Sequence, residues 1–216
     1  MNPLSGCIFL YICTIDVHLC INSMSVSKTR AMLVEVARQL FAQKGVVDTT
    51  MNDIAAASQK GRRTLYTYFR NKEEIYMACV ESELQLVTAA LQTVTKMDIE
   101  PDKKIEVFVR THFDVIKDMV IRNGNLHAHF FRDIMEIEKL RRKLDSKEAI
   151  MLAQILNEGQ EKGLFNVKDI RKTAQILQFA IKGLEVPYIR ENIRNLKDQN
   201  QAIYDFLFFG LKGKKE

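Results

Sequence analysis

The sequence predicts an all-α protein, with a small N-terminal helix-turn-helix domain of three helices followed by a larger helical domain. Only 9 Gly and 3 Pro occur in 216 residues, so helix breakers are rare. The charge is uneven: residues 25–72 hold nine Lys or Arg and three acidic residues, whereas residues 73–216 hold 23 of each. The composition, 47% hydrophobic and 27% charged, excludes collagen-like, disulfide-scaffold and highly charged disordered chains. We expect an extension over 1–24, a helix-turn-helix domain over 25–72 and a helical body over 73–216.

The extension over 1–24 is apolar but is not expected to be a targeting signal. It lacks a basic start, and Asp16 and His18 interrupt it before the roughly 20 apolar residues of a membrane span. Our hypothesis is that Met24 is the working start of the protein, with a membrane anchor as the alternative. The four cysteines form no C-x-x-C pair, so no zinc, redox or other cofactor site is expected. With no membrane candidate elsewhere, we expect a cytoplasmic protein with reduced thiols and no metal.

The basic block begins with two predicted helices. Apolar residues at three- and four-residue steps predict an amphipathic helix over 28–44, which Gly45 ends as a C-terminal cap. Thr50 is the expected N-cap of a second helix of about two turns, with Asp53 in the capping-box position. The stripe of the first helix consists of Met32, Leu33, Val36, Ala37, Leu40 and Phe41.

A tight turn and a third helix follow, so the last two helices form a helix-turn-helix candidate. Gly61 is expected to supply a backbone conformation that other residues resist. In RRTLYTYF, Leu65 and Phe69 lie four residues apart and should pack on Ile54, Ala55 and the first helix. The opposite strip carries Arg63, Thr64, Thr67 and Tyr68.

That strip has the chemistry that groove binding needs. Arginine pairs with the O6 and N7 acceptors of guanine, threonine meets base edges, and tyrosine hydroxyls bond phosphate oxygens. Two alternatives stay open: Tyr66 and Tyr68 could be half-buried core aromatics, and the basic block could be only a solvated face.

The run TTMNDIAAASQKGRRTLYTYFRNKEEIY resembles the DNA-binding signature of the TetR family of transcriptional regulators, whose pattern includes T-L-Y-x-(H/Y)-F-x-x-K-(E/D). The match covers residues 28–75. It implies a helix-capping, phosphate-contacting role for Thr50 and a base- or backbone-facing role for Asn52. It also implies groove-facing positions at Arg62, Arg63, Thr64 and Thr67, and phosphate ligands at Tyr66, Tyr68 and Lys72. The chain departs from the pattern at Lys60-Gly61-Arg62, where relatives usually have Gly-Val-Ser, and at Arg63, so its base preference cannot be copied from relatives.

The neutral body is expected to contain helices over about 72–95, 102–122, 126–136, 139–162, 168–189 and 196–211. The first should bury Ile75, Ala78, Cys79, Ser82 and Leu86. The charged run Glu136–Lys143, with Arg141 and Arg142, is interpreted as a solvated face. The resemblance implies a small-molecule pocket in the middle helices, with ordinary core as the alternative. Its candidate lining residues are Phe108, His112, Phe113, His127, Phe130 and Phe131.

The resemblance further implies a homodimer through the last two helices, about 168–211, which would space two recognition helices about 34–36 Å apart. A purely intramolecular core explains the same stripes. An effector that binds preferentially to a state in which the two recognition helices are wrongly spaced for DNA would weaken DNA binding. We therefore expect a repressor that binds a palindromic double-stranded DNA operator until an unknown small molecule releases it.

Two other classes of function were weighed. An enzyme is not expected, because His127 and His129 lie about 200° apart around a helix and no hydrolase, metalloprotease or phosphate-loop motif occurs. The remaining alternative is a helical interaction module whose basic end binds acidic lipid or protein. A rigid helix-turn-helix lacks the amphipathic aromatic face of a membrane-surface helix, so no membrane partner is expected.

Overall fold

The computed structural model describes residues 28–124 and 135–190, and no β-strand occurs in that part of the chain. The all-helical fold class is confirmed. The chain divides into two compact units, Met1–Cys79 and Val80–Glu216, with the division inside one long helix. The boundary predicted after residue 72 falls at the start of this helix. The predicted extension, most of the helix predicted over 126–136, and the helix predicted over 196–211 lie outside the described residues.

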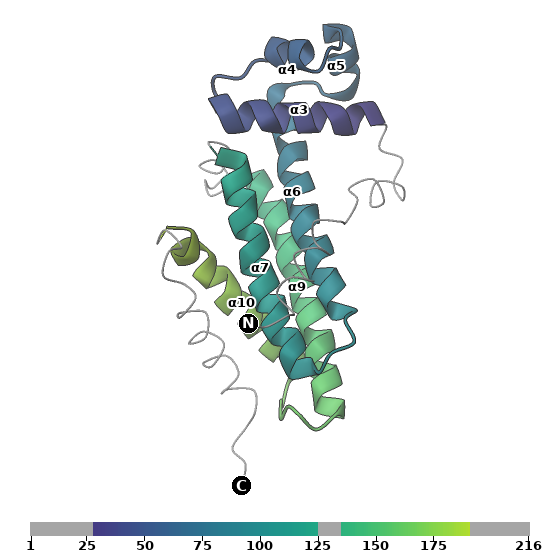
Figure 1. The fold of residues 1–216 in the computed structure, drawn as a ribbon, viewed down its shortest axis with the longest axis vertical. Helices are drawn as coiled ribbons and strands as arrows, with labels where there is room; N and C mark the ends of the chain where they lie inside the picture. The colour runs from purple at the N-terminus through teal and green to yellow at the C-terminus, as the bar shows by residue number, and fades with distance from the viewer. Residues whose placement is uncertain (1–27, 125–134, 191–216) are drawn as a thin grey trace, which may run out of the picture. The chain divides into compact units, whose positions relative to one another are not determined.

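The first unit contains α3 (Lys28–Lys44), α4 (Met51–Ala57), α5 (Arg62–Tyr68) and the start of α6 (Lys72–Thr95). In Figure 1, α4 and α5 lie together on one side of α3. The apolar stripe of α3 forms here because three- and four-residue steps bring those side chains to one face. The core of this unit is made of Leu33, Ala37, Phe41, Ile54, Leu65, Phe69, Ile75 and Cys79.

The first two turns of this unit, between α3 and α4 and between α4 and α5, each contain a residue with positive φ. Gly45 has φ +87°, and its N–H donates to the carbonyl of Phe41 at 2.9 Å, so the predicted C-terminal cap is confirmed. In the second turn the expectation was wrong. Gln59 has φ 53°, whereas Gly61 has φ −63° and ψ 148°, which any residue can adopt. A Cβ added at Gly61 would meet nothing within 4 Å.

The second unit contains the rest of α6 together with α7 (Pro101–Asn123), α9 (Met135–Glu161) and α10 (Ile170–Arg190). Helices α7, α9 and α10 pack against one another (Figure 1). Phe165 follows a turn at Gly163, which has φ +71°, and its ring covers Gly159 of α9. The core of this unit includes Val87, Leu91, Ile105, Phe108, Phe113, Leu152, Ile155, Leu156 and Ile181.

Two expectations about these helices were wrong. Residues 135–138 belong to α9, because no Gly or Pro separates them from residue 139 and the residues between favour helix. On α6, Ser82 and Leu86 are exposed, and the positions buried after Cys79 include Val80, Glu83, Leu84, Val87 and Leu91. These buried positions recur at three- and four-residue steps, so they form one face of α6, and Ser82 and Leu86 lie off that face. No helix that the structure describes is long and apolar enough to span a bilayer.

Candidate nucleic-acid interface

The start of α4 is fixed by a capping box between Thr50 and Asp53. The hydroxyl of Thr50 accepts the N–H of Asp53 at 3.2 Å, and the carboxylate of Asp53 accepts the N–H and the hydroxyl of Thr50, both at 2.9 Å. These hydrogen bonds lower the pKa of Asp53, with a smaller contribution from Lys44 at 3.8 Å. The predicted cap is confirmed, and it leaves Thr50 and Asn52 exposed at the N-terminal end of α4.

Helix α5 is held from one side only. Leu65 is fully buried and Phe69 is 2% exposed, as the spacing predicted. The guanidinium of Arg30 on α3 lies 5.0 Å from the centre of the Phe69 ring, a cation–π contact between α3 and the end of α5. A seven-residue helix is marginal by itself, so this one-sided packing is what orients its outer face.

The outer face of α5 presents cationic and hydroxyl groups to solvent. Arg62, Arg63, Tyr66 and Thr67 are exposed, and Thr64 is partly exposed. The hydroxyl of Thr67 donates to the carbonyl of Arg63 at 2.9 Å, which leaves its methyl group and its lone pairs outward.

The tyrosines and the lysine predicted to bind phosphate are all accessible. Tyr66 is 45% exposed and Tyr68 is partly exposed, so neither is buried in the core. The ammonium group of Lys72 donates one N–H to the carbonyl of Val47, with 3.0 Å between the two heavy atoms. Two N–H groups of Lys72 remain for another acceptor.

Among the described residues, the cations at positions 60, 62, 63 and 70 of this surface have no carboxylate partner. Within the part of the chain that is described, no acidic group lies in ion-pair distance of Lys60, Arg62, Arg63 or Arg70. Arginines without an acidic partner bind phosphate oxygens or guanine edges without first breaking an internal ion pair. This group of cations, with the hydroxyls of α5, is a surface suited to a polyanion.

One feature at the start of α6 was missed by the sequence analysis. The side-chain carbonyl of Asn71 accepts the N–H of Glu74 at 2.8 Å, and the carboxylate of Glu74 accepts the N–H of Arg70. This arrangement ends α5 and begins α6 within three residues, and it fixes the backbone beside Lys72. The signal was present as Asn-x-x-Glu, a capping-box pattern like that of Thr50 and Asp53.

Only some of the residues proposed from sequence to line a pocket lie in the part of the chain that the structure describes. Phe108, His112 and Phe113 are buried on α7, and the rings of His112 and Phe113 meet edge to face at 5.4 Å between centres. His127, Phe130 and Phe131 lie outside the described residues. The pocket assignment therefore stays a prediction.

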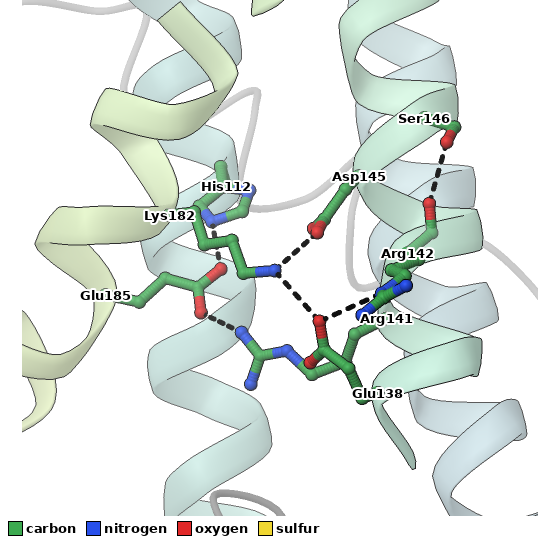
Figure 2. A network of polar contacts seen from close by, with 8 residues as sticks. All are labelled: His112, Glu138, Arg141, Arg142, Asp145, Ser146, Lys182 and Glu185. Atoms are coloured by element: carbon green, nitrogen blue, oxygen red, sulfur yellow. Dashed lines mark hydrogen bonds and ion pairs between the residues drawn. The ribbon is translucent and has the colours of Figure 1, made fainter. Parts of the chain in front are cut away.

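His112 has polar partners that no local pattern indicated. Its Nδ1 lies 3.0 Å from a carboxylate oxygen of Glu148 on α9, and its Nε2 lies 3.2 Å from one of Glu185 on α10. Arg141 also pairs with Glu185 and is 17% exposed (Figure 2). The interpretation of the run Glu136–Lys143 as a solvated face is wrong for Arg141, because that side chain turns inward to meet Glu185.

The described residues contain no group of three His, Cys, Asp or Glu side chains that could hold a metal ion. The two carboxylates beside His112 contact different ring nitrogens. Their geometry is that of hydrogen bonding across three helices.

Comparison with known proteins identifies the same N-terminal region. A family model described as bacterial regulatory proteins, tetR family, matches residues 33–79. A probable acrEF/envCD operon repressor of Escherichia coli K12 is 47% identical over 49 residues, which are 23% of this chain and 22% of that protein. The chain thus matches about a fifth of the length of this relative.

Longer matches extend into the body at lower identity. The probable HTH-type transcriptional regulator ArpR of Pseudomonas putida is 28% identical over 152 residues, 65% of this chain and 72% of the relative. A solved SmeT–triclosan complex has a TM-score of 0.68 at 17% identity, covering 87% of this chain and 93% of that one. This structural likeness concerns the fold.

Proposed function

Since this chain belongs to the TetR family of transcriptional regulators, a family without enzymatic activity, we propose that it is a repressor that binds a specific double-stranded DNA operator. The observation that carries the proposal is the outer face of α5. Arg62, Arg63 and Thr67 project from a helix whose other side is locked by Leu65 and Phe69. A rigid helix with exposed donors is what the major groove admits.

The residues of this surface divide into two roles. Arg62, Arg63, Thr64 and Thr67 face the groove, where Arg63 reads a base edge. The remaining contacts bind phosphate and position the helix without reading sequence. They come from Thr50, Asn52, Tyr66, Tyr68 and Lys72.

The proposed operator is palindromic, because the protein is proposed to act as a homodimer through the region of about 168–211. Helix α10 supports this. Ile176 and Phe179 are 65% and 66% exposed on its outer side, although both are large apolar residues. Apolar side chains at a three-residue step on one helix face are suited to a second copy of the same helix.

The body is proposed to bind a small apolar or amphipathic effector near Phe108, His112 and Phe113 of α7. The SmeT–triclosan complex, which has a related fold, contains a small molecule, and this supports an effector-binding role for the body as a whole. An effector that favours mis-spaced recognition helices would weaken DNA binding, with a coupling of about 1–3 kcal/mol. We place the protein in the cytoplasm, where chromosomal DNA is found.

The test is selection from a random duplex pool by the full chain, followed by fluorescence anisotropy of the enriched duplex beside a scrambled one in competitor DNA. Supporting results are an enriched inverted repeat with half-sites one helical turn apart and saturation at two protomers, or a multiple of two, per site. Failure to enrich any sequence would refute sequence-specific binding. Binding to anionic vesicles alone would favour an interaction module.

Two variants separate the proposed roles. Arg63→Ala should cost about 1–3 kcal/mol on the preferred operator and relax the base preference at one position. Lys72→Ala should weaken binding to all duplexes and lower the salt dependence. Arg142→Ala, which removes an exposed arginine of α9, is the matched control and should leave binding unchanged. Equal losses on every duplex for Arg63→Ala would make Arg63 a phosphate contact.

A further inference from the structure

A group of buried charges lies where α7, α9 and α10 meet. We call His112, Glu148, Glu185 and Arg141 the His112 cluster. The side chains of His112, Glu148 and Glu185 are 1%, 2% and 5% exposed. Figure 2 shows the imidazole of His112 and the guanidinium of Arg141 reaching the two oxygens of Glu185 from α7 and α9.

The geometry determines the charge of His112. Carboxylates only accept hydrogen bonds, and both ring nitrogens of His112 face a carboxylate oxygen, at 3.0 and 3.2 Å. A neutral imidazole has one N–H and would leave its other nitrogen lone pair against an anion. The imidazolium satisfies both contacts.

The electrostatics agree with this assignment. Burial alone lowers the pKa of His112, but the charges and hydrogen bonds of Glu148 and Glu185 outweigh it and raise the pKa to about 10. In turn, the hydrogen bond from His112 and the charge of Arg141 overcome the opposing effect of burial and lower the pKa of Glu185. Both groups are therefore held in their charged forms.

The charges within the cluster cancel. His112 and Arg141 supply two positive charges, and Glu148 and Glu185 supply two negative charges. Another cation, Lys182 of α10, pairs with Asp145 and Glu138 of α9, so it does not replace His112 (Figure 2). If His112 lost its proton, one buried negative charge would have no partner.

We propose that the His112 cluster is an electrostatic latch that docks α10 against α7 and α9 while His112 is charged and releases α10 when that charge is removed. Apolar contacts, such as those of Phe108 and Ile181, tolerate small sliding movements because they have no direction. Hydrogen-bonded ion pairs do not, because a displaced buried charge loses its partner and is not compensated by water. Helix α10 therefore has two states with respect to the cluster, docked or released.

The latch has a consequence for regulation that rests on the proposed function. Helix α10 is the described part of the proposed dimer region, and His112 lies in the proposed effector region of α7. An effector that disturbs the cluster would move α10 in a single step, because sub-ångström shifts of a buried ion pair are not accommodated gradually.

The first test measures the protonation of His112 in the unmodified protein. Nitrogen chemical shifts of the imidazole should report two protonated ring nitrogens at pH 8. A neutral tautomer at that pH would overturn the proposal. The measurement needs neither DNA nor an effector, so its failure is distinct from failure of the proposed function.

The second test measures hydrogen exchange of the amides of α10 at pH 7. His112→Gln should accelerate exchange across 174–185 by at least about tenfold, because a buried anion loses its partner, while α3, α4 and α5 are unchanged. Lys104→Gln is the matched control: it breaks a partly buried ion pair between α7 and Glu158 of α9 that does not involve α10. It should leave α10 unaffected.

A charge-balanced variant separates charge from shape. His112→Gln with Glu148→Gln removes one cation and one anion, which leaves Glu185 paired with Arg141. This double variant should recover most of the protection of α10. If it exchanges as fast as His112→Gln alone, or if His112→Gln leaves α10 fully protected, charge is not what docks α10 and the latch is refuted.

Discussion

Removing the hydroxyl of Thr50 should destabilise α4 by the free energy that its capping hydrogen bonds contribute. Thr50→Val keeps the shape of the side chain but loses the acceptor for the N–H of Asp53 and the donor to its carboxylate, at 3.2 and 2.9 Å. The expected cost is about 1 kcal/mol, typical of an N-cap, because Thr50 is exposed and water reaches the orphaned N–H. Helix α4 has only seven residues, so few other internal bonds compensate.

Amide hydrogen exchange resolves this loss within α4. A loss of 1 kcal/mol corresponds to about fivefold faster exchange at Ile54 and Ala55. Thr50→Ser keeps the hydroxyl and should exchange within a factor of about two of the unmodified protein. Thr93→Val removes a hydroxyl that bonds within α6 at 3.0 Å, and it should leave α4 unchanged.

If Thr50→Val exchanged at the unmodified rate, or if Thr50→Ser exchanged as fast as Thr50→Val, the hydroxyl of Thr50 would not be what stabilises α4. A pH dependence adds a check. Hydrogen bonds from Thr50 lower the folded-state pKa of Asp53 below 3.8, so the stabilisation by its carboxylate is present above pH 3.8 and is lost as the pH falls through the lowered pKa. The difference between Thr50→Val and the unmodified protein should shrink over that range.

Three further predictions concern the second unit. The pKa of His112 rises from 6.5 to about 10 on folding, so its stabilisation is fully present below pH 6.5 and is lost toward pH 10. The free energy of unfolding, measured with urea, should fall by up to about 1.4 kcal/mol per pH unit between pH 7 and 9. An equal fall in His112→Gln would contradict this assignment. Gly159→Ala should cost about 1–3 kcal/mol, because the added Cβ would lie 2.1 Å from the ring of Phe165. Gly183→Ala has nothing within 4 Å and should be neutral or stabilising in the same thermal melts; equal losses for both would discount the steric argument. Phe179→Asp should convert the proposed dimer into a monomer by sedimentation velocity, and a persistent dimer would exclude this face of α10 from the interface.

The local features of the first unit could be predicted from sequence because their causes lie within a few residues. The cap of Thr50, the end of α3 at Gly45 and the burial of Leu65 and Phe69 each follow from spacing along a single helix. The turn was harder, because the left-handed residue there is Gln59 and not a glycine. Glycine is favoured at positive φ because it has no Cβ, but other residues also adopt this conformation.

The sequence by itself determined the helical fold class, the position of the third short helix and the concentration of positive charge around it. Only the tertiary structure decided which polar residues of the body are buried. His112 and Glu185 are 73 residues apart, and Arg141 and Glu185 are 44 apart. Helical periodicity specifies the direction in which a side chain leaves the axis of its own helix. A buried ion pair between two helices also depends on how the axes of those helices are placed relative to each other. That position is set by the packing of α7, α9 and α10 together.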